Sequence, residues 1–204
     1  MSAPPRVRRA EEAEKDIVGE VLHSAFGDEA GLNYWLLQGA AKERARRRFF
    51  HKIVRDGVHR QRELWLAEDA TGPAGAAIWL GPGYKAYDFG VWEQMLLAPV
   101  LIQSAGIAGA LRGLDLAERL EKQHPTVPHA HLVYLGVAPR AQGTGVGSAM
   151  LKHVLAEVDE ARLPAFLECS SERNRALYAR HGFEVTGELD LPGLHFWSMT
   201  RPAR

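Results

Sequence analysis

The spacing of hydrophobic positions changes several times along the chain. Short apolar or alternating segments predict β-strands, and apolar residues at helical spacing predict α-helices. Strands are expected at residues 7–9, 63–68, 76–80, 132–137, 164–168, 183–189 and 194–200. Helices are expected at residues 10–26, 31–60, 87–123, 146–163 and 174–182, with the third broken near Pro99 and Gly106. This order predicts a mixed sheet with helices on both faces.

A glycine-rich turn lies between the strand at 132–137 and the helix at 146–163. It reads Gln142, Gly143, Thr144, Gly145, Val146, Gly147 and Ser148. Backbone N–H groups at a helix start lack partners within the helix, and the helix dipole is positive there. Glycines leave these amides open to a phosphate, so the turn predicts an anion site.

Two common phosphate-binding motifs do not fit this turn. A P-loop closes with a Lys and a Ser or Thr, and no Lys is present here. A dinucleotide site has G-x-G-x-x-G near the start of a βαβ unit, whereas these glycines read G-x-G-x-G late in the chain.

The turn does match the pattern Q/R-x-x-G-x-G/A, through Gln142, Gly145 and Gly147. A strand ending in Leu-Gly-Val precedes it, and Asn174, Tyr178 and a Gly-Phe pair follow it. Over residues 132–199 this order resembles the GNAT superfamily of N-acetyltransferases. The segment PAFLECSSERNRALYARHGFEV and the closing FWSMTRP are similar to puromycin N-acetyltransferase-like members.

The resemblance implies an α/β (α+β) fold with a mostly antiparallel sheet of six to seven strands. The strands carrying Leu135 and Glu168 would splay apart to admit the pantetheine arm of acetyl-CoA, the cosubstrate. A bulge at Gly136 would free the N–H of Val137 to stabilise the thioester oxygen. The implied acetyl-CoA contacts are Leu135, Gly136, Val137, Gln142, Gly143, Thr144, Gly145, Val146, Gly147, Ser148, Asn174 and Tyr178.

The candidate catalytic residues are Tyr178 and Glu168. Tyr178 shares a helix face with Asn174, and its phenol, with a pKa near ~10, could protonate the leaving thiolate. The alternatives are a core tyrosine and, for Asn174, a helix-start residue that bonds local backbone. Glu168 occupies the place where many family members carry a general base, and burial would raise its pKa. Its alternative is a strand-end carboxylate that is either solvated or paired with an arginine such as Arg173 or Arg175.

Other reactive side chains are given structural roles. Cys169 should face away from Glu168 and behave as a buried small hydrophobe. His129 and His131 could share one face as partly exposed strand residues that relay a proton at most, and no metal site is expected without further ligands. A run of basic residues is expected to form a solvated helix face, with attraction of an acidic partner or of the CoA 3′-phosphate as the alternative. These residues are Arg44, Arg46, Arg47, Arg48, Lys52, Arg55, Arg60 and Arg62.

Composition is consistent with one enzyme-sized domain. The chain has 204 residues, 46% hydrophobic content and a formal net charge of zero. We expect a single domain over residues 1–204, with 1–128 shaping the acceptor site and 129–204 binding acetyl-CoA. We expect neither the apolar core of a signal peptide nor an apolar run long enough to span a membrane. The chain is therefore predicted to be cytoplasmic and to have no nucleic-acid or membrane partner. A monomer or homodimer is expected.

The predicted function is transfer of acetyl from acetyl-CoA to the primary amine of a small molecule. Aromatic residues after the first hairpin could line an aromatic acceptor pocket or simply pack in the core, and they are Trp79, Tyr84, Tyr87, Phe89 and Trp92. A protein or peptide N-acetyltransferase and a non-catalytic acyl-CoA sensor remain the alternatives.

Overall fold

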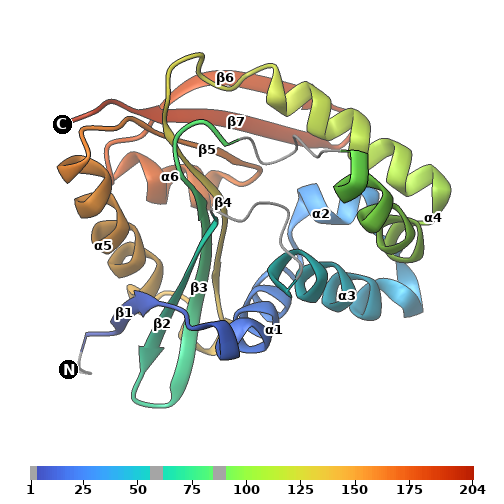
Figure 1. The fold of residues 1–204 in the computed structure, drawn as a ribbon, viewed down its shortest axis with the longest axis horizontal. Coiled ribbons are helices and arrows are strands. Elements are labelled where there is room, and N and C mark those ends of the chain that lie inside the picture. The colour runs from blue at the N-terminus through green and yellow to red at the C-terminus, as the bar shows by residue number, and fades with distance from the viewer. Residues whose placement is uncertain (1–3, 56–61, 85–90) are drawn as a thin grey trace.

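A single seven-stranded sheet runs through the molecule (Figure 1). The computed structural model describes residues 4–55, 62–84 and 91–204, and side chains in the last range from residue 98 onward. The strand order is β1-β2-β3-β4-β5-β7-β6, and every neighbouring pair is antiparallel except β4 and β5. The strands are β1 (Arg6–Arg9), β2 (Arg62–Asp69), β3 (Gly72–Leu80), β4 (Ala130–Val137), β5 (Ala165–Cys169), β6 (Glu184–Leu191) and β7 (Leu194–Arg201). The expected mixed, mostly antiparallel sheet is confirmed.

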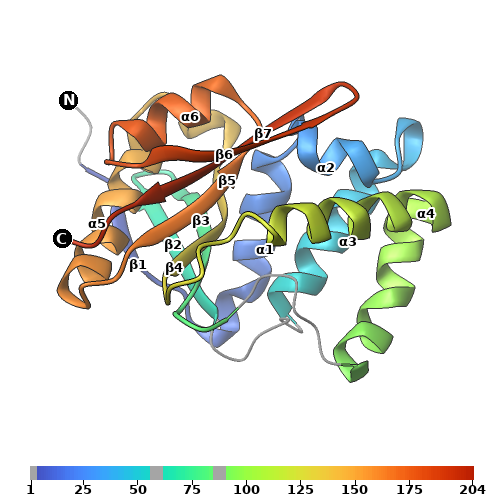
Figure 2. The ribbon, with the colours of Figure 1, turned by 90° about the horizontal axis from the view of Figure 1, so that it is seen from above.

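Helices cover both faces of the sheet (Figure 2). One face carries α1 (Lys15–Ala25), α2 (Ala30–Trp35), α3 (Lys42–Arg55) and α4 (Val91–Glu121). The other carries α5 (Val146–Glu160) and α6 (Glu172–Ala179). Three short 3-10 helices complete the described elements: η1 (Glu12–Glu14), η2 (Gly39–Ala41) and η3 (Pro139–Ala141).

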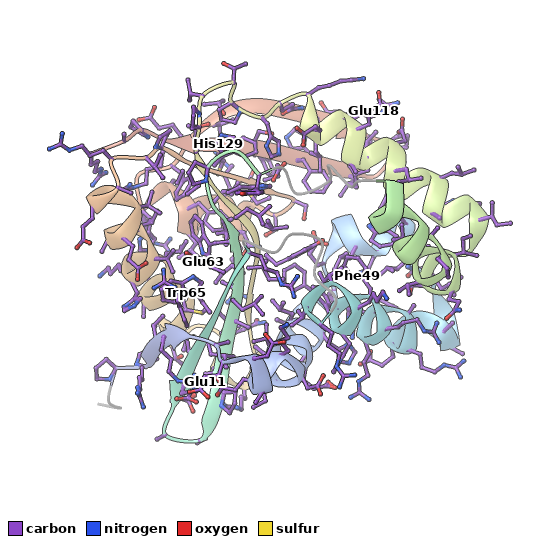
Figure 3. The ribbon with its side chains drawn as sticks, in the orientation of Figure 1. Glu11, Phe49, Glu63, Trp65, Glu118 and His129 are labelled. Carbon is purple, nitrogen blue, oxygen red and sulfur yellow. The ribbon has the colours of Figure 1, made fainter. Side chains whose placement is uncertain are left out.

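Alternation along β2 separates the two hydrophobic cores. Trp65 packs with Met150 and Leu151 of α5, whereas Leu66 packs with Leu22 of α1 and with residues of α3. Trp65 therefore lies on the α5 side of the sheet, while Phe49 projects from α3 on the opposite side (Figure 3). Period-two alternation sends neighbouring side chains to opposite faces, so both faces of β2 are buried.

The prediction of one helix over residues 31–60 was wrong. Within the described residues, α2 ends at Trp35, Leu36 and Gln38 are extended, and Gly39 has a φ of 63° before α3 begins. The backbone N–H of Leu37 donates to the carbonyl of Ser104 at 2.9 Å. A tertiary hydrogen bond to α4 thus replaces a helical one, which apolar spacing alone does not reveal.

Helix α4 bends at Gly106, where φ is 67° and ψ is 171°. The expected break at Gly106 is confirmed, whereas Pro99 lies inside the helix without one. By length and composition, the part Ala98–Glu121 could cross a membrane, contrary to the expectation that no such run exists. Ala105, Leu116 and Leu120 pack into the core below the helix, but only 28% of the apolar window is buried. Ile102, Ile107, Leu111 and Leu114 are exposed on its other side.

Gly136 allows α1 to pack closely on β4. Gly136 pairs in register with Ala76, so the prediction of a bulge at Gly136 was wrong. The register of β3 and β4 shifts instead at Val133, which lies between the pairs Ile78↔Tyr134 and Trp79↔Leu132 and has no partner on β3. A Cβ at position 136 would lie 2.8 Å from the Cβ of Ala25. The glycine is therefore explained by helix packing.

Replacement of Gly136 by Ala should lower the free energy of unfolding by about 1–3 kcal/mol, because the added methyl overpacks the contact with α1. Urea denaturation would measure the loss. Gly81→Ala is a matched control, since a Cβ there meets no atom within 4 Å. Equal stability of the two variants would show that α1 moves away at little cost.

Candidate active site

Strands β4 and β5 separate just beyond their first three pairs. Their parallel pairing runs from Ala130↔Ala165 to Leu132↔Leu167 and goes no further. The rest of β4, including Leu135, therefore has no partner on the β5 side, and Glu168 follows the last paired residue of β5. The expected splay between the strands carrying Leu135 and Glu168 is confirmed.

The backbone of Leu135 and Val137 faces this opening. The N–H of Ala138 donates to the carbonyl of Ala74 on β3 at 2.9 Å. In an antiparallel pair, every second residue directs its backbone N–H and C=O groups to the neighbouring strand, and the residues between direct theirs away from it. Leu135 and Val137 belong to the second set. The Val137 carbonyl indeed accepts from Nε2 of Gln142 at 3.2 Å. The Val137 N–H thus points into the splay because of strand alternation.

The glycine turn leads directly into the start of α5. Gly143 and Gly145 have φ values of 80° and 93°, and a Cβ at either would meet no atom within 4 Å. The first bond of the helix runs from the Ala149 N–H to the Gly145 carbonyl at 2.9 Å, so the amides of Val146, Gly147 and Ser148 have no acceptor within the helix. The space that a Cβ of Gly143 or Gly145 would enter is open, which leaves room for an anion beside the helix start.

The polar side chains of the turn hold its shape. The hydroxyl of Thr144 donates to the Ala141 carbonyl at 2.7 Å, and Ser148 Oγ lies 2.8 Å from Nε2 of His181. Gln142 links β4 to α6, because its Oε1 accepts from Arg173 at 3.5 Å. These side chains position the backbone donors.

Helix α6 brings Asn174 and Tyr178 to one cavity. Ser171 caps the helix by accepting from the Asn174 N–H at 3.3 Å, and the exposed side chain of Asn174 lies on the cavity wall. Tyr178 is buried and lines the same wall. Burial raises the pKa of Tyr178, and Cys169 and Glu29 add to the effect, so the phenol stays protonated at neutral pH.

The cavity has a volume of about 220 Å³ and a largely apolar wall. Besides Tyr178, the aromatic side chains of its wall among the described residues come from four elements and the turn after α1, and they are Phe26, Trp35, Phe49, Tyr134 and Phe196. Trp35 and Phe49 meet edge to face with centroids 5.1 Å apart, and Tyr134 lies 5.7 Å from Phe26. The wall is therefore aromatic as well as apolar.

These are not the aromatic residues that the sequence suggested. Trp79 is buried in the core on the α5 side of the sheet, and Tyr84 is not on the cavity wall. Tyr87 and Phe89 lie outside the described residues, as does the side chain of Trp92. Trp35 and Phe49 were recognised as buried positions, but their spacing does not distinguish a cavity wall from a filled core.

Glu168 lies between two imidazoles. Its Oε1 is 3.1 Å from Nε2 of His124, and its Oε2 is 2.9 Å from Nε2 of His131. Burial alone would raise the pKa of Glu168, but the charge of His131 and the hydrogen bonds of both histidines outweigh it and lower the pKa to about 2. The expected rise was wrong because the sequence did not bring these histidines beside the carboxylate.

The histidines differ from their predicted roles. His131 is fully buried rather than partly exposed, and His124 was not recognised as a candidate. His129 and His131 do share a face, since both rings contact Phe166. The possible ligand atoms of His124, His131 and Glu168 lie within 4.8 Å of one another. His124 and Glu168 thus lie beside His131 as the further ligands that the sequence did not suggest. Each Nε2, however, already has a carboxylate oxygen at hydrogen-bond distance.

Cys169 and the arginines after β5 take structural roles. Burial raises the pKa of Cys169 to about 12, and its sulfur lies 3.9 Å from that of Met199. Arg175 pairs with Glu172 instead of Glu168. Cys169 is thus a buried neutral thiol, as expected.

The basic helix face is largely neutralised within the protein. Arg46 is buried and pairs with Glu43, Arg47 pairs with Glu20, and Arg55 pairs with Asp16. The members from Arg44 to Arg55 lie on α3, across the sheet from the glycine turn, and Arg60 is outside the described residues (Figure 1). Placing Arg62 on the helix was wrong, because it begins β2, and Lys52 and Arg62 line the cavity.

Glu29 is a second carboxylate on the cavity wall that the sequence did not suggest. It caps α2 by accepting from the N–H groups of Gly31 and Leu32 at 2.9 and 2.6 Å. It also accepts a hydrogen bond from the hydroxyl of Ser170, at the end of β5. The sequence did not indicate that Glu29 caps α2, because Glu is uncommon at the N-cap position of helices.

The separation of β4 from β5 beside the unpaired amides at the start of α5 is the arrangement of an acyl-CoA-dependent transferase. The chain matches the acetyltransferase (GNAT) family over residues 34–183, and it belongs to that family, whose members take acetyl from acetyl-CoA. The crystal structure of a histone acetyltransferase HPA2 and related acetyltransferase from Corynebacterium glutamicum is 26% identical, with a TM-score of 0.76 over 100% of this chain and 98% of that one.

Two curated relatives match parts of the chain. A 5-NmdU N-acetyltransferase of Pseudomonas phage PaMx11 is 38% identical over 61 residues, covering 30% of this chain and 44% of the relative. An uncharacterized N-acetyltransferase, C550.08, of Schizosaccharomyces pombe is 28% identical over 119 residues, covering 54% and 47%. The chain thus spans less than half the length of either relative.

Proposed function

We propose that this protein transfers acetyl from acetyl-CoA directly to the primary amine of a small, partly apolar molecule in a ternary complex. The observation that carries the proposal is one cavity in which Glu168 and the buried Tyr178 meet an aromatic wall. This cavity adjoins the splay between β4 and β5, where the thioester would enter.

The donor would lie along the splay, with its pyrophosphate on the amides at the start of α5. The N–H of Val137 would donate to the thioester oxygen as charge develops there. In this assignment Asn174 contacts the pantetheine arm. The residues after 128 then hold the donor, while most of the acceptor wall comes from residues 1–128.

Glu168 and Tyr178 would have complementary proton-transfer roles. Glu168, which its two histidines keep ionised, accepts a proton from the acceptor ammonium and leaves a neutral amine to attack the thioester carbon. Because the pKa of Glu168 is lowered to about 2, this transfer is uphill and is drawn forward as the neutral amine is consumed. Tyr178 donates its proton to the departing thiolate and recovers one from the nitrogen that has formed the amide. Each turnover converts an ammonium and a thioester into an amide, a thiol and one released proton.

The cavity favours a small acceptor over a protein one. The largely apolar wall carries the carboxylates Glu29 and Glu168 and the cations Lys52 and Arg62, and Glu168 would face the ammonium of an acceptor with an apolar body. The name of the phage relative suggests 5-NmdU as one acceptor to try. The resemblance to puromycin N-acetyltransferase-like members, which rests on residues 164–185, suggests aromatic amines as another group.

A panel assay tests this function. Purified protein, acetyl-CoA and a thiol reagent are combined with 5-NmdU, aromatic and alkyl amines, or peptides with free N-termini and lysines. We expect CoA release with at least one small amine, accompanied by its acetylated product. Transfer to peptides alone would favour the protein-directed alternative, and acetyl-CoA binding without transfer to any acceptor would favour a sensor.

A further inference from the structure

The acceptor cavity carries charged side chains of both signs. The carboxylates Glu29 and Glu168 lie on its wall, and so do the cationic side chains of Lys52 and Arg62. All of these residues are partly shielded from solvent, and the wall around them is largely apolar. Charges act more strongly in such surroundings than on an open surface. Their positions therefore restrict which molecules the cavity can hold.

The carboxylates lie at the side of the cavity formed by β5. Glu168 belongs to this strand, and Glu29 accepts a hydrogen bond from the hydroxyl of Ser170, which directly follows it. The β5 side of the cavity adjoins the separation of β4 from β5, where the thioester would enter. An acceptor ammonium held at this negative end would thus lie close to the acetyl group.

The cations lie at the opposite side of the cavity. Arg62 is the first residue of β2, and its Nη2 donates to the carbonyl of Val54 in the last turn of α3. Lys52 belongs to the same end of α3. Both cations therefore lie where α3 ends and β2 begins, and they form the positive end of the cavity.

The strand register gives the distance between the two ends. Arg62 pairs with Leu80, Leu80 with His131, and His131 with Phe166, so these residues form one row across β2, β3, β4 and β5. Oε2 of Glu168 lies 2.9 Å from Nε2 of His131. Measured across the sheet, the carboxylate is thus two to three strand spacings, or roughly 10–14 Å, from the Arg62 backbone. One small molecule can reach from end to end.

We propose that the acceptor is amphoteric, with its primary ammonium beside Glu168 and Glu29 and an anionic group, a carboxylate or a phosphate, beside Lys52 and Arg62. The inference rests on the proposed function. Arginine and lysine both bind such anions, and the guanidinium fork matches either one. A molecule bound the other way round would place like charges together at both ends. The charges would therefore also direct the amine toward the thioester.

The experiment uses acceptors that share one aromatic amine and differ at the far end. They are 4-(2-aminoethyl)benzoate, its primary amide, the corresponding phosphonate, and the diamine in which an aminomethyl group replaces the carboxylate. Wild-type protein is compared with Lys52→Met, Lys52→Glu and Arg62→Gln. Arg47→Gln is the matched control, because Arg47 lies on α3 with its side chain 61% exposed and paired with Glu20. Thermal unfolding and acetyl-CoA titration show whether each variant is folded and holds the donor.

We expect wild-type protein to prefer the benzoate or the phosphonate over the amide at least about tenfold in kcat/KM, which is the size of a charge-assisted hydrogen bond. The preference should lie mainly in KM, because the anion is far from the reacting nitrogen. Lys52→Met and Arg62→Gln should each remove most of it, with a loss several times smaller for the amide. Lys52→Glu should shift the preference toward the diamine. Arg47→Gln should keep the wild-type preference.

Equal kcat/KM of wild-type protein for the anionic acceptors and the amide would overturn the amphoteric acceptor and leave acetyl transfer standing. Folded variants that keep the wild-type preference, or that lose activity equally toward the benzoate and the amide, would do the same. If Arg62→Gln fails to fold, the two Lys52 variants decide. Wild-type protein that transfers acetyl to no amine, here or in the wider panel, would refute the proposed function as well.

Discussion

Tyr178→Phe should lower kcat by about 10²-fold or more and leave acetyl-CoA affinity within about twofold, the pattern of a lost general acid. The phenol is buried on the cavity wall and its pKa is raised, so it carries a proton that a thiolate can take. Phenylalanine keeps the packing against Phe183, whose ring centroid is 6.0 Å away. Steady-state kinetics and direct acetyl-CoA titration would separate turnover from binding.

Tyr134→Phe provides the comparison, because it removes another phenol from the wall of the same cavity. We expect it to change KM for the acceptor without a comparable loss of kcat. If Tyr178→Phe turned over at the wild-type rate, Tyr178 would have no part in proton transfer, and a water molecule would be the next candidate acid.

The second large effect is expected at the glycine turn. Gly145→Val should weaken acetyl-CoA binding at least about tenfold, equivalent to about 1.4 kcal/mol. The residue has a φ of 93°, and the space that its Cβ would enter contains no protein atom within 4 Å. The new side chain would occupy the space proposed for the pyrophosphate. A β-branched residue at this φ also costs about 1–3 kcal/mol of strain, which lowers stability.

Gly193→Val separates strain from lost binding. Gly193 lies in the turn between β6 and β7 with a φ of 75°, and a Cβ there also meets no atom within 4 Å. Its valine variant should lose similar stability yet bind acetyl-CoA like wild type. Titration and thermal unfolding of both variants decide the question: unchanged affinity in Gly145→Val would place the pyrophosphate elsewhere.

The donor half could be predicted from sequence because its signals are local. Within residues 132–148 a strand, a glycine-rich turn and a helix start follow one another. The spacing of apolar residues identifies the strand and the helix, and the glycines identify the turn. The β6 and β7 hairpin is likewise a contact between neighbours in the chain. The splay followed from the family resemblance, and the strand pairing confirms it.

The surroundings of Glu168 could not be predicted, because they depend on contacts between distant residues. His124 and His131 precede Glu168 by 44 and 37 positions. Whether a buried carboxylate has a raised or lowered pKa depends on such neighbours more than on burial itself. The bulge was misplaced for a related reason: a glycine in a strand can serve either a bulge or a close helix, and only the packing of Ala25 distinguishes them.

The part of α4 after Gly106 contributes both to the wall of the cavity and to the position of His124 beside Glu168. Its second part packs over the acceptor cavity through Leu116 and Leu120, and the chain then leads directly to His124. A rigid shift of this part, made to admit a larger acceptor, would also carry the imidazole away from Glu168. We therefore expect that new acceptor preferences can be engineered most readily by exchanging side chains before the bend at Gly106, such as Val100 and Leu101, since these line the cavity without supporting the carboxylate.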